Sequence, residues 1–202
     1  MQALVIGVLA LQGAFGKHAE MLRSLDVKVI EIRKPIDLVD CDALVIPGGE
    51  STTMLKQMQF IGFAPPFCEF AKSKPVFGTC AGLILMSHDI VADEMIPFNL
   101  LDITVERNAF GRQVESFQTE VEFTPKKSSE KNTQKLPAMF IRAPRILRTG
   151  SEVQILATYQ GEPVLVQQGH HLGATFHPEL TFNPAIHAHF IKICKSREGD
   201  DS

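Results

Sequence analysis

The sequence is poor in the residues that mark disulfide-rich, redox or zinc-binding proteins. It has no tryptophan, one tyrosine and four cysteines among 202 residues, and no two cysteines form a Cys-x-x-Cys pair. This pattern argues against the common zinc and dithiol motifs and indicates free thiols in a reducing compartment, so we expect a cytoplasmic protein. One cysteine is a candidate nucleophile, discussed below. We expect the other three to be small residues of the core: Cys41, Cys68 and Cys194.

The sequence also lacks a long apolar run and a clear charge excess. No stretch reaches the roughly 18 apolar residues that a membrane helix needs. The apolar start, Ala3–Leu11, has no basic leader or small-residue cleavage site, so it predicts a buried strand rather than a signal peptide. With 20 Lys and Arg against 23 Asp and Glu, the net charge is −3. This balance argues against nucleic acid or membrane partners held by bulk charge.

The first half of the chain alternates short apolar runs with amphipathic patterns. The runs predict strands, and the patterns predict helices because their apolar residues recur at spacings of three and four. We expect strands at Ala3–Leu9, Val27–Ile32, Ala43–Ile46 and Pro75–Phe77, and helices at Ala14–Leu25, from Ser51 onward and at Leu83–Ser87. Alternating strands and helices predict a parallel sheet that is covered on both faces.

The second half changes to strands that alternate apolar and polar residues, as antiparallel strands do. We expect strands at Leu101–Arg107, Phe117–Phe123, Met139–Arg142, Val153–Thr158, Pro163–Gln168 and Leu172–Phe176, and a closing helix at Pro184–Cys194. The polar, lysine-rich Thr124–Pro137 predicts a mobile surface loop rather than a linker, because strands resume after it. We expect one domain over residues 1–196, followed by a polar tail, 197–202.

Cys80 occupies the position of a nucleophile in a sharp turn between a predicted strand and a predicted helix. The sequence Gly78-Thr79-Cys80-Ala81-Gly82 places a glycine two residues before it and two residues after it. Small neighbours let the backbone turn sharply and lift the side chain clear of the sheet. The start of the following helix favours a thiolate, the form that attacks carbonyl carbons. Cys80 is therefore the predicted nucleophile.

A thiol nucleophile needs a base, and His177-Pro178-Glu179 follows a predicted strand. Side chains at positions i and i+2 of an extended chain share a face, so Glu179 can orient His177 while His177 faces Cys80.

The other paired histidines predict no site. His187 and His189 lie two apart on a predicted helix and face different ways, so we expect both at the surface. His170 and His171 follow Gly169 and predict a turn. We expect neither a metal site nor a bound cofactor.

A second glycine-containing junction, Pro47-Gly48-Gly49-Glu50-Ser51, ends one predicted strand and opens a helix. Glycines let backbone N–H groups approach a ligand, as an oxyanion hole requires, although a plain turn accounts for the same residues. Glu50 is a candidate for a substrate ammonium group, and Arg107 and Arg142 are candidates for a carboxylate. Spacing alone does not decide these roles.

These motifs together resemble a known family. The stretch Gly78-Thr79-Cys80-Ala81-Gly82-Leu83, with the distant His177-Pro178-Glu179, looks like a class I, triad-type glutamine amidotransferase. Within that class, the sequence from about residue 4 to about residue 193 resembles the glutaminase subunits of pyridoxal 5′-phosphate synthase. Four further stretches carry this resemblance: Gly7–Gly13, Pro47–Thr53, Glu106–Gln113 and Phe140–Pro144.

The resemblance implies an α/β, flavodoxin-like three-layer sandwich with a mixed, mostly parallel central sheet flanked by helices. It implies hydrolysis of L-glutamine to L-glutamate and ammonia through a Cys-His-Glu triad and a thioester. Ammonia would pass through a tunnel to a separate, barrel-shaped synthase subunit that makes pyridoxal 5′-phosphate.

The resemblance also assigns roles residue by residue. Cys80 matches the nucleophile, His177 the base and Glu179 its orienter. The residues that match glutamine contacts are Gly48, Gly49, Glu50, Arg107, Ile141 and Arg142. Gly49 belongs to the oxyanion loop, and Gln12 matches a residue at the partner-facing edge of the site. Lys17 stands where members usually have a glutamate before the histidine at position 18, which reverses a charge near the docking face.

Two other functions stay open. One is a related α/β cysteine hydrolase that acts on another amide, against which the complete Pro47–Thr53 motif argues. The other is a catalytically silent scaffold that only binds the synthase, against which the intact Cys80, His177 and Glu179 argue. A glutamate-release assay separates the scaffold from both enzymes.

Overall fold

The computed structural model describes residues 3–107, 116–125 and 133–198. Its larger sheet has nine strands, which are, from edge to edge, β2 (Lys28–Ile32), β1 (Val5–Leu9), β3 (Ala43–Ile46), β4 (Val76–Thr79), β12 (His171–Ala174), β11 (Glu162–Gln168), β10 (Gln154–Tyr159), β7 (Ser116–Phe123) and β8 (Gln134–Ile141). A smaller sheet has the order β5 (Ser87–Ile90), β6 (Leu101–Glu106) and β9 (Arg145–Thr149).

The large sheet has a parallel half and an antiparallel half. All pairs from β2 to β12 are parallel. All pairs from β12 to β8 are antiparallel. Strands β1, β3 and β4 are buried along their whole length, as expected for continuous apolar runs covered on both faces. The prediction of an α/β fold with a mixed sheet is therefore confirmed.

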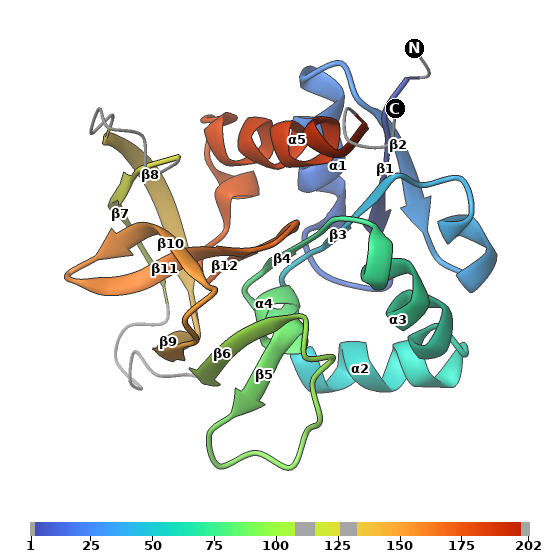
Figure 1. The fold of residues 1–202 in the computed structure, drawn as a ribbon, viewed down its shortest axis with the longest axis horizontal. Coiled ribbons are helices and arrows are strands. Elements are labelled where there is room, and N and C mark those ends of the chain that lie inside the picture. Colours follow the sequence, from blue (N-terminus) through green and yellow to red (C-terminus); the bar gives the residue numbers. More distant parts are fainter. Residues whose placement is uncertain (1–2, 108–115, 126–132, 199–202) are drawn as a thin grey trace.

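Helices cover both faces of the parallel half (Figure 1). One face carries α1 (Phe15–Ser24) and α5 (Ala185–Glu198), and the other carries α2 (Ser51–Phe60), α3 (Ala64–Ser73) and α4 (Ala81–Met86). Successive side chains of β1 point to opposite faces of the sheet and pack against the helices on each face. Ile6 packs in the cluster that contains Leu22 of α1, whereas Val5 packs in the cluster that contains Met54 of α2. Among the helices of the described ranges, none is long and apolar enough to span a membrane.

One predicted loop is too long, and three elements were not predicted: α3, β5 and β9. The predicted loop Thr124–Pro137 is shorter, because β8 begins at Gln134 and pairs with β7 through Phe123 and Gln134. Residues 126–132 of that loop lie outside the described residues. Helix α3 was not predicted because two prolines open it, although proline is tolerated in the first helical turn. Strands β5 and β9 were not predicted either, because they lack a clear alternation of apolar and polar residues.

One prediction about burial is also wrong. Cys68 is exposed, whereas Cys41 and Cys194 are buried as expected. The buried face of α3 is set by Phe67 and Ala71, and Cys68 is one residue away from it.

The histidine predictions fail at His187 and His171, whereas His170 lies in the predicted turn. His187 is fully buried, because Phe190, Ile191 and Cys194 follow it at spacings that define the buried face of α5. His171 lies in β12 and is buried rather than being part of a turn. His189 is half-buried.

Candidate active site

Cys80 lies between β4 and α4 in a backbone conformation that residues with side chains rarely adopt. Its φ is 50° and its ψ is −103°. Such strain persists only where neighbours fix it. The N–H of Cys80 donates to the carbonyl of Ala174 at 2.8 Å, and its own carbonyl accepts from the N–H of Ile84 at 3.1 Å. The turn therefore presents the thiol at the end of the parallel strands.

The two glycines around Cys80 are required by close packing. A Cβ at Gly78 would lie 2.6 Å from the backbone of Gly82, and a Cβ at Gly82 would lie 2.1 Å from the carbonyl oxygen of Ile46. Both distances are far below a normal contact. The glycine spacing seen in the sequence therefore allows α4 to pack directly on the ends of β3 and β4.

His177 and Glu179 form a buried, hydrogen-bonded pair. The Nδ1 of His177 donates to Oε1 of Glu179 at 2.7 Å. Glu179 lies in a short 3₁₀ turn, η2 (Pro178–Leu180), rather than on an extended chain. The backbone N–H of His177 donates to the carbonyl of Met139 at 2.8 Å, which ties the pair to β8.

Electrostatics keep this pair ionised. Burial lowers the pKa of His177, but hydrogen bonds with Cys80 and Glu179 outweigh burial and raise the pKa to about 10. Burial raises the pKa of Glu179, but the nearby His18 and His177 outweigh it and hold the pKa below its usual value. The arrangement therefore favours an imidazolium beside a carboxylate, with the thiol on the other side of the ring.

Cys80 and His177 open onto a cavity of about 310 Å³. All six residues predicted to contact glutamine line this cavity: Gly48, Gly49, Glu50, Arg107, Ile141 and Arg142. The loop that contains Gly48 and Gly49 packs directly against the ring of His177, since a Cβ at Gly48 would lie 2.3 Å from Cε1 of His177. The structure thus brings together residues from five separate segments of the chain.

Glu50 and Arg107 are already engaged within the protein. The Glu50 carboxylate caps α2 by accepting from the N–H of Thr52 at 3.1 Å and the N–H of Thr53 at 2.7 Å. The hydroxyl of Thr53 also donates to it at 2.6 Å, which is the main reason why the pKa of Glu50 falls to about 2. Arg107 donates to Glu50 at 3.2 Å and to Asp93 at 2.5 Å. Glu50 therefore stays ionised and holds Arg107 at the cavity wall.

Arg142 differs from Arg107 in having an exposed side chain with no ion pair to any described residue. Its φ is 41°, another uncommon value for a residue with a side chain. The preceding Ile141 contributes its carbonyl, which accepts from the Cys80 thiol at 3.8 Å. Arg142 is thus a cation that remains available at the wall of the cavity.

Gln12 lies behind the glycine loop. Its Oε1 accepts from the backbone N–H of Glu50 at 3.0 Å, and its Nε2 donates to the carbonyl of Glu50 at 3.3 Å. A Cβ at Gly49 would lie 3.0 Å from the same Oε1. Gln12 therefore fixes the peptides on both sides of Glu50 without lining the cavity itself.

Residues 8–196 match the family described as the SNO glutamine amidotransferase family. The chain belongs to this family. Curated relatives agree. The pyridoxal 5′-phosphate synthase subunit PdxT of Desulforamulus reducens is 49% identical over 193 residues, which are 95% of this chain and 100% of that protein. PdxT of Thermosipho africanus is 46% identical over 191 residues, which are 94% of this chain and 98% of that protein.

Solved structures share the fold of this SNO-family chain. A crystal structure of a glutamine amidotransferase has a TM-score of 0.86 at 41% identity and covers 94% of this chain and 98% of that chain. PurLQS from Thermotoga maritima has a TM-score of 0.67 at 14% identity and covers 95% and 99% of the two chains. The second likeness shows the fold alone.

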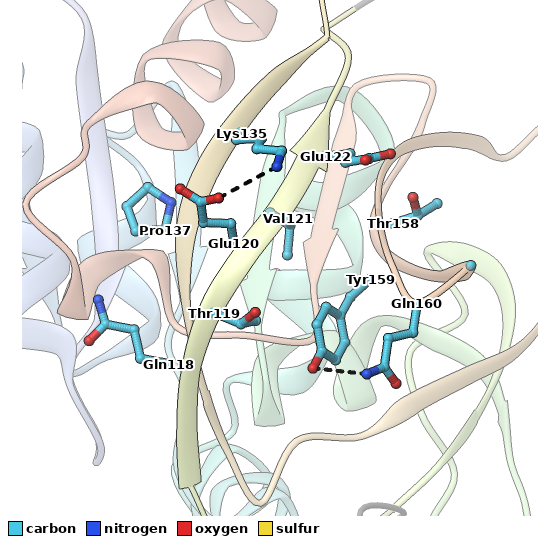
Figure 2. Close-up of a pocket in the computed structure, with 11 residues that line it drawn as sticks. Gln118, Thr119, Glu120, Val121, Glu122, Lys135, Pro137, Thr158, Tyr159 and Gln160 are labelled. Carbon is cyan, nitrogen blue, oxygen red and sulfur yellow. Dashed lines mark hydrogen bonds and ion pairs between the residues drawn. The ribbon is translucent and has the colours of Figure 1, made fainter.

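The protein has a second cavity, larger than the one at Cys80. It measures about 750 Å³ and is formed by β7, β8 and the turn after β10 (Figure 2). Two pairs of its polar side chains contact each other: Lys135 with Glu120 at 3.9 Å, and Gln160 with Tyr159 at 3.2 Å. It contains none of the predicted site residues. The smaller cavity at Cys80 is therefore the candidate active site.

Sequence reasoning missed several residues at this site. Ser51, Ile84 and Leu180 line the cavity, and His18, Thr79 and His187 lie behind Glu179. The sequence did hold a signal for His18, because Leu22 follows it by four residues on the buried face of α1. Within the described residues, no cluster of side chains is suited to a metal ion.

Proposed function

We propose that this chain is the glutaminase subunit of a pyridoxal 5′-phosphate synthase, in which Cys80, His177 and Glu179 form the catalytic triad. The observation that carries the proposal is the position of His177, which bonds Glu179 at 2.7 Å and shares one cavity with Cys80. The names of the curated relatives support the assignment to this synthase.

The reaction begins when His177 holds the proton of Cys80 and the thiolate attacks the side-chain carbonyl carbon of glutamine. Collapse of the tetrahedral adduct breaks the C–N bond, and His177 gives its proton to the leaving ammonia. The product is a thioester between Cys80 and the glutamyl group. A water molecule then loses a proton to His177 and attacks the thioester. This step releases glutamate and restores the thiol.

The glycine loop supplies the oxyanion hole in this proposal. Negative charge develops on the amide oxygen during attack, and a backbone N–H at Gly49 stabilises it. Gln12 supports this role because it holds the adjoining Gly49–Glu50 peptide by accepting from the N–H of Glu50, and it also donates to the carbonyl of Glu50.

Glutamine is a zwitterion, so the site has to match two charges. Arg142 receives the carboxylate, since its guanidinium has no ion pair to a described residue. The ionised Glu50 supplies negative charge for the ammonium group, and it also positions Arg107. Ile141 and Gly48 complete the wall.

The ammonia passes to a barrel-shaped synthase subunit that docks at the Gln12 edge. Free ammonia from an unpartnered subunit wastes glutamine, so hydrolysis is slow until that partner binds. We place the protein in the cytoplasm, in keeping with four free cysteines.

The test is glutamate release from glutamine, with and without the purified barrel subunit. We expect slow release by this chain alone, a large rise with the partner, and no release by Cys80→Ala in either case. A wild-type chain that binds the partner but releases no glutamate would be a silent scaffold. Release of ammonia from another amide, with glutamine untouched, would identify a different hydrolase.

Thiol labelling tests the nucleophile independently. A glutamine analogue with an electrophilic carbon should label Cys80 alone, because recognition of the glutamine moiety directs it to the cavity. A general alkylating reagent should also label the exposed Cys68. Cys68→Ser is therefore the matched control, and it should keep full activity.

A further inference from the structure

Glu179 is contacted from both of its oxygens, and only one of them faces His177. The second oxygen, Oε2, lies 3.3 Å from Nε2 of His18, a residue of α1 that is fully buried. Oε2 accepts no hydrogen bond from a described residue, so His18 meets it as a close electrostatic contact. The same Nε2 lies 3.1 Å from the hydroxyl of Thr79, the residue before the nucleophile. His18 thus sits behind the triad, on the side of the carboxylate away from His177.

A second buried histidine continues this line. The Nε2 of His187, on α5, lies 2.9 Å from Nδ1 of His18, and His187 is also fully buried. The edge of Phe77 meets both imidazole rings, with centroid distances of 6.1 and 5.9 Å. Two polar rings in an apolar wall cost free energy unless their hydrogen bonds are satisfied. Their presence therefore calls for a reason beyond filling space.

The contacts are consistent with one proton arrangement. Burial lowers the pKa of His187 to about 3, and burial also lowers the pKa of His18 despite the charge of Glu179. Burial therefore favours the neutral form of both rings, in which each ring carries one N–H. The nitrogen of His18 that faces the Glu179 carboxylate has to be the donor, because a lone pair there would be repelled.

The positions of the other protons on the two rings follow from that choice. With the proton on Nε2, the Nδ1 of His18 is an acceptor, so Nε2–H of His187 donates to it. This leaves Nδ1 of His187 as a bare acceptor, and that atom has no hydrogen-bond partner among the described residues. An unpaired acceptor costs less than an unpaired N–H would, since buried orphan N–H groups are the rarer case.

We propose that His18 and His187 are positioning residues of the triad, forming a buried chain from His187 through His18 and Glu179 to His177. The N–H of His18 attracts the second oxygen of Glu179 across the 3.3 Å contact, which helps to fix the carboxylate in the orientation that serves His177. His187 acts one step further back by setting the tautomer of His18. The inference deepens the proposed function, because it concerns the same site.

The first test reads the protons directly. ¹⁵N spectra of the full-length protein labelled at histidine report which nitrogen of each ring carries a proton. We expect His18 and His187 to be neutral Nε2–H tautomers near neutral pH. An imidazolium or an Nδ1–H tautomer at His18 would overturn the proposal. This readout needs no substrate or partner, so it stands or falls separately from the glutaminase assignment.

The second test compares matched substitutions. His18→Leu removes the donor, whereas His18→Gln keeps an amide N–H near the position of Nε2. We expect His18→Leu to lower kcat by about 10- to 100-fold, as loss of an outer partner of a functional group typically does, with KM little changed. His18→Gln should recover most of the loss. Equal kcat values for His18→Leu and the wild type would show that His18 only fills space.

The same variants should change the titration of His177, which a purely structural role would not do. We expect the pKa of His177 to fall in His18→Leu, because a loosely held Glu179 bonds it less well, and to stay near the wild-type value in His18→Gln. If His18→Leu does not fold, the wild-type tautomers and the kcat of His18→Gln still decide the matter. A His18→Gln protein that folds but is as inactive as Cys80→Ala would count against the donor role.

A double-mutant cycle tests whether His187 acts through His18. We expect His187→Leu to lower kcat less than His18→Leu does, and to have no further effect in the His18→Leu background. Additive losses in kcat would show that His187 does not act through His18, and His187 would then not be a positioning residue of the triad.

Discussion

Gly82 lies against the carbonyl oxygen of Ile46, so closely that a Cβ at Gly82 would stand 2.1 Å from that oxygen. Ile46 ends β3 and directly precedes the loop of Gly48 and Gly49, whereas Gly82 belongs to the helix that follows Cys80. The proposed nucleophile and the proposed oxyanion loop therefore meet through a backbone contact. Any side chain at position 82 separates them.

We expect Gly82→Ala to reduce glutamate release strongly and to destabilise the fold by about 1–3 kcal/mol, as overpacking of a tight contact does. Gly16→Ala is the matched control, because a Cβ at Gly16, within α1, meets nothing within 4 Å. Alanine there should raise stability by about 0.5–1 kcal/mol, since glycine is unfavourable inside a helix. Thermal unfolding and activity of the two variants check this. A Gly82→Ala protein with wild-type activity would contradict the prediction.

The triad predicts unequal effects at its two supporting positions. His177→Asn should be nearly as damaging as Cys80→Ala, because nucleophile and base act as a unit. Glu179→Gln should be milder, since it weakens orientation but leaves the base in place. Glutamate release by the three variants measures the order. A harmless Glu179→Gln beside an essential His177 would remove Glu179 as the orienter.

The pH dependence of kcat/KM should report the charged state of His177. Its pKa lies near 10, above the ordinary 6.5, so the proton that it gives to ammonia remains available until pH rises through about 10. The bond to Glu179 is one of the causes that raise this pKa, so Glu179→Gln should move the alkaline fall in kcat/KM to lower pH. A fall that stays in place would argue against this coupling.

The parts of the site that could be predicted from the sequence are those fixed by local chemistry. The glycines around Cys80 mark a sharp turn, and His177 and Glu179 are only two residues apart. The remaining parts depend on contacts between distant segments. His18 and His187 meet across 169 positions, and Gln12 meets Glu50 across 38. Histidine is intermediate among residue types in how often it is buried, so its burial at these positions follows from helix packing rather than from residue type.

Glu50 should stabilise the fold in a pH-dependent way, because it caps α2. Its folded pKa of about 2 lies below the ordinary 4.5, so its contribution is full above pH 4.5 and is lost as pH falls toward about 2. Urea unfolding of the wild type and Glu50→Gln at several pH values checks this. The difference in unfolding free energy should shrink across that window. A difference that is constant with pH would show that the cap needs no charge.

Substrate recognition predicts a KM effect at Arg142. Arg142→Ala should raise KM for glutamine with little change in stability, because its exposed guanidinium makes no ion pair with a described residue. Arg148→Ala is a suitable control, since Arg148 is exposed, pairs with Asp102 and does not line the cavity. Steady-state kinetics of the two variants should differ clearly. A wild-type KM in Arg142→Ala would exclude it from the glutamine site.

Control by the partner should depend on Gln12. Gly48 and Gly49 have no side chains to resist a change of peptide orientation, and only one orientation directs an N–H at the developing oxyanion. Gln12 holds the adjoining peptide by accepting from the N–H of Glu50 at 3.0 Å, and it donates to the carbonyl of Glu50 at 3.3 Å. An oxyanion donor is worth about 10²–10³ in rate, so we expect the barrel subunit to raise glutamate release by up to that factor. Gln12→Ala should fold and bind the partner but lose most of the rise.

The matched control is Gln154→Ala, at an exposed position on β10 in the antiparallel half of the sheet. It should respond to the partner as the wild type does. The measurement is glutamate release with and without the barrel subunit, together with the affinity of each variant for that subunit. Affinity separates loss of docking from loss of activation, because Gln12→Ala should change activation far more than binding. Full activity of the unpartnered wild-type chain would refute partner control through this loop while leaving the triad unaffected, since the triad requires only that Cys80, His177 and Glu179 act together.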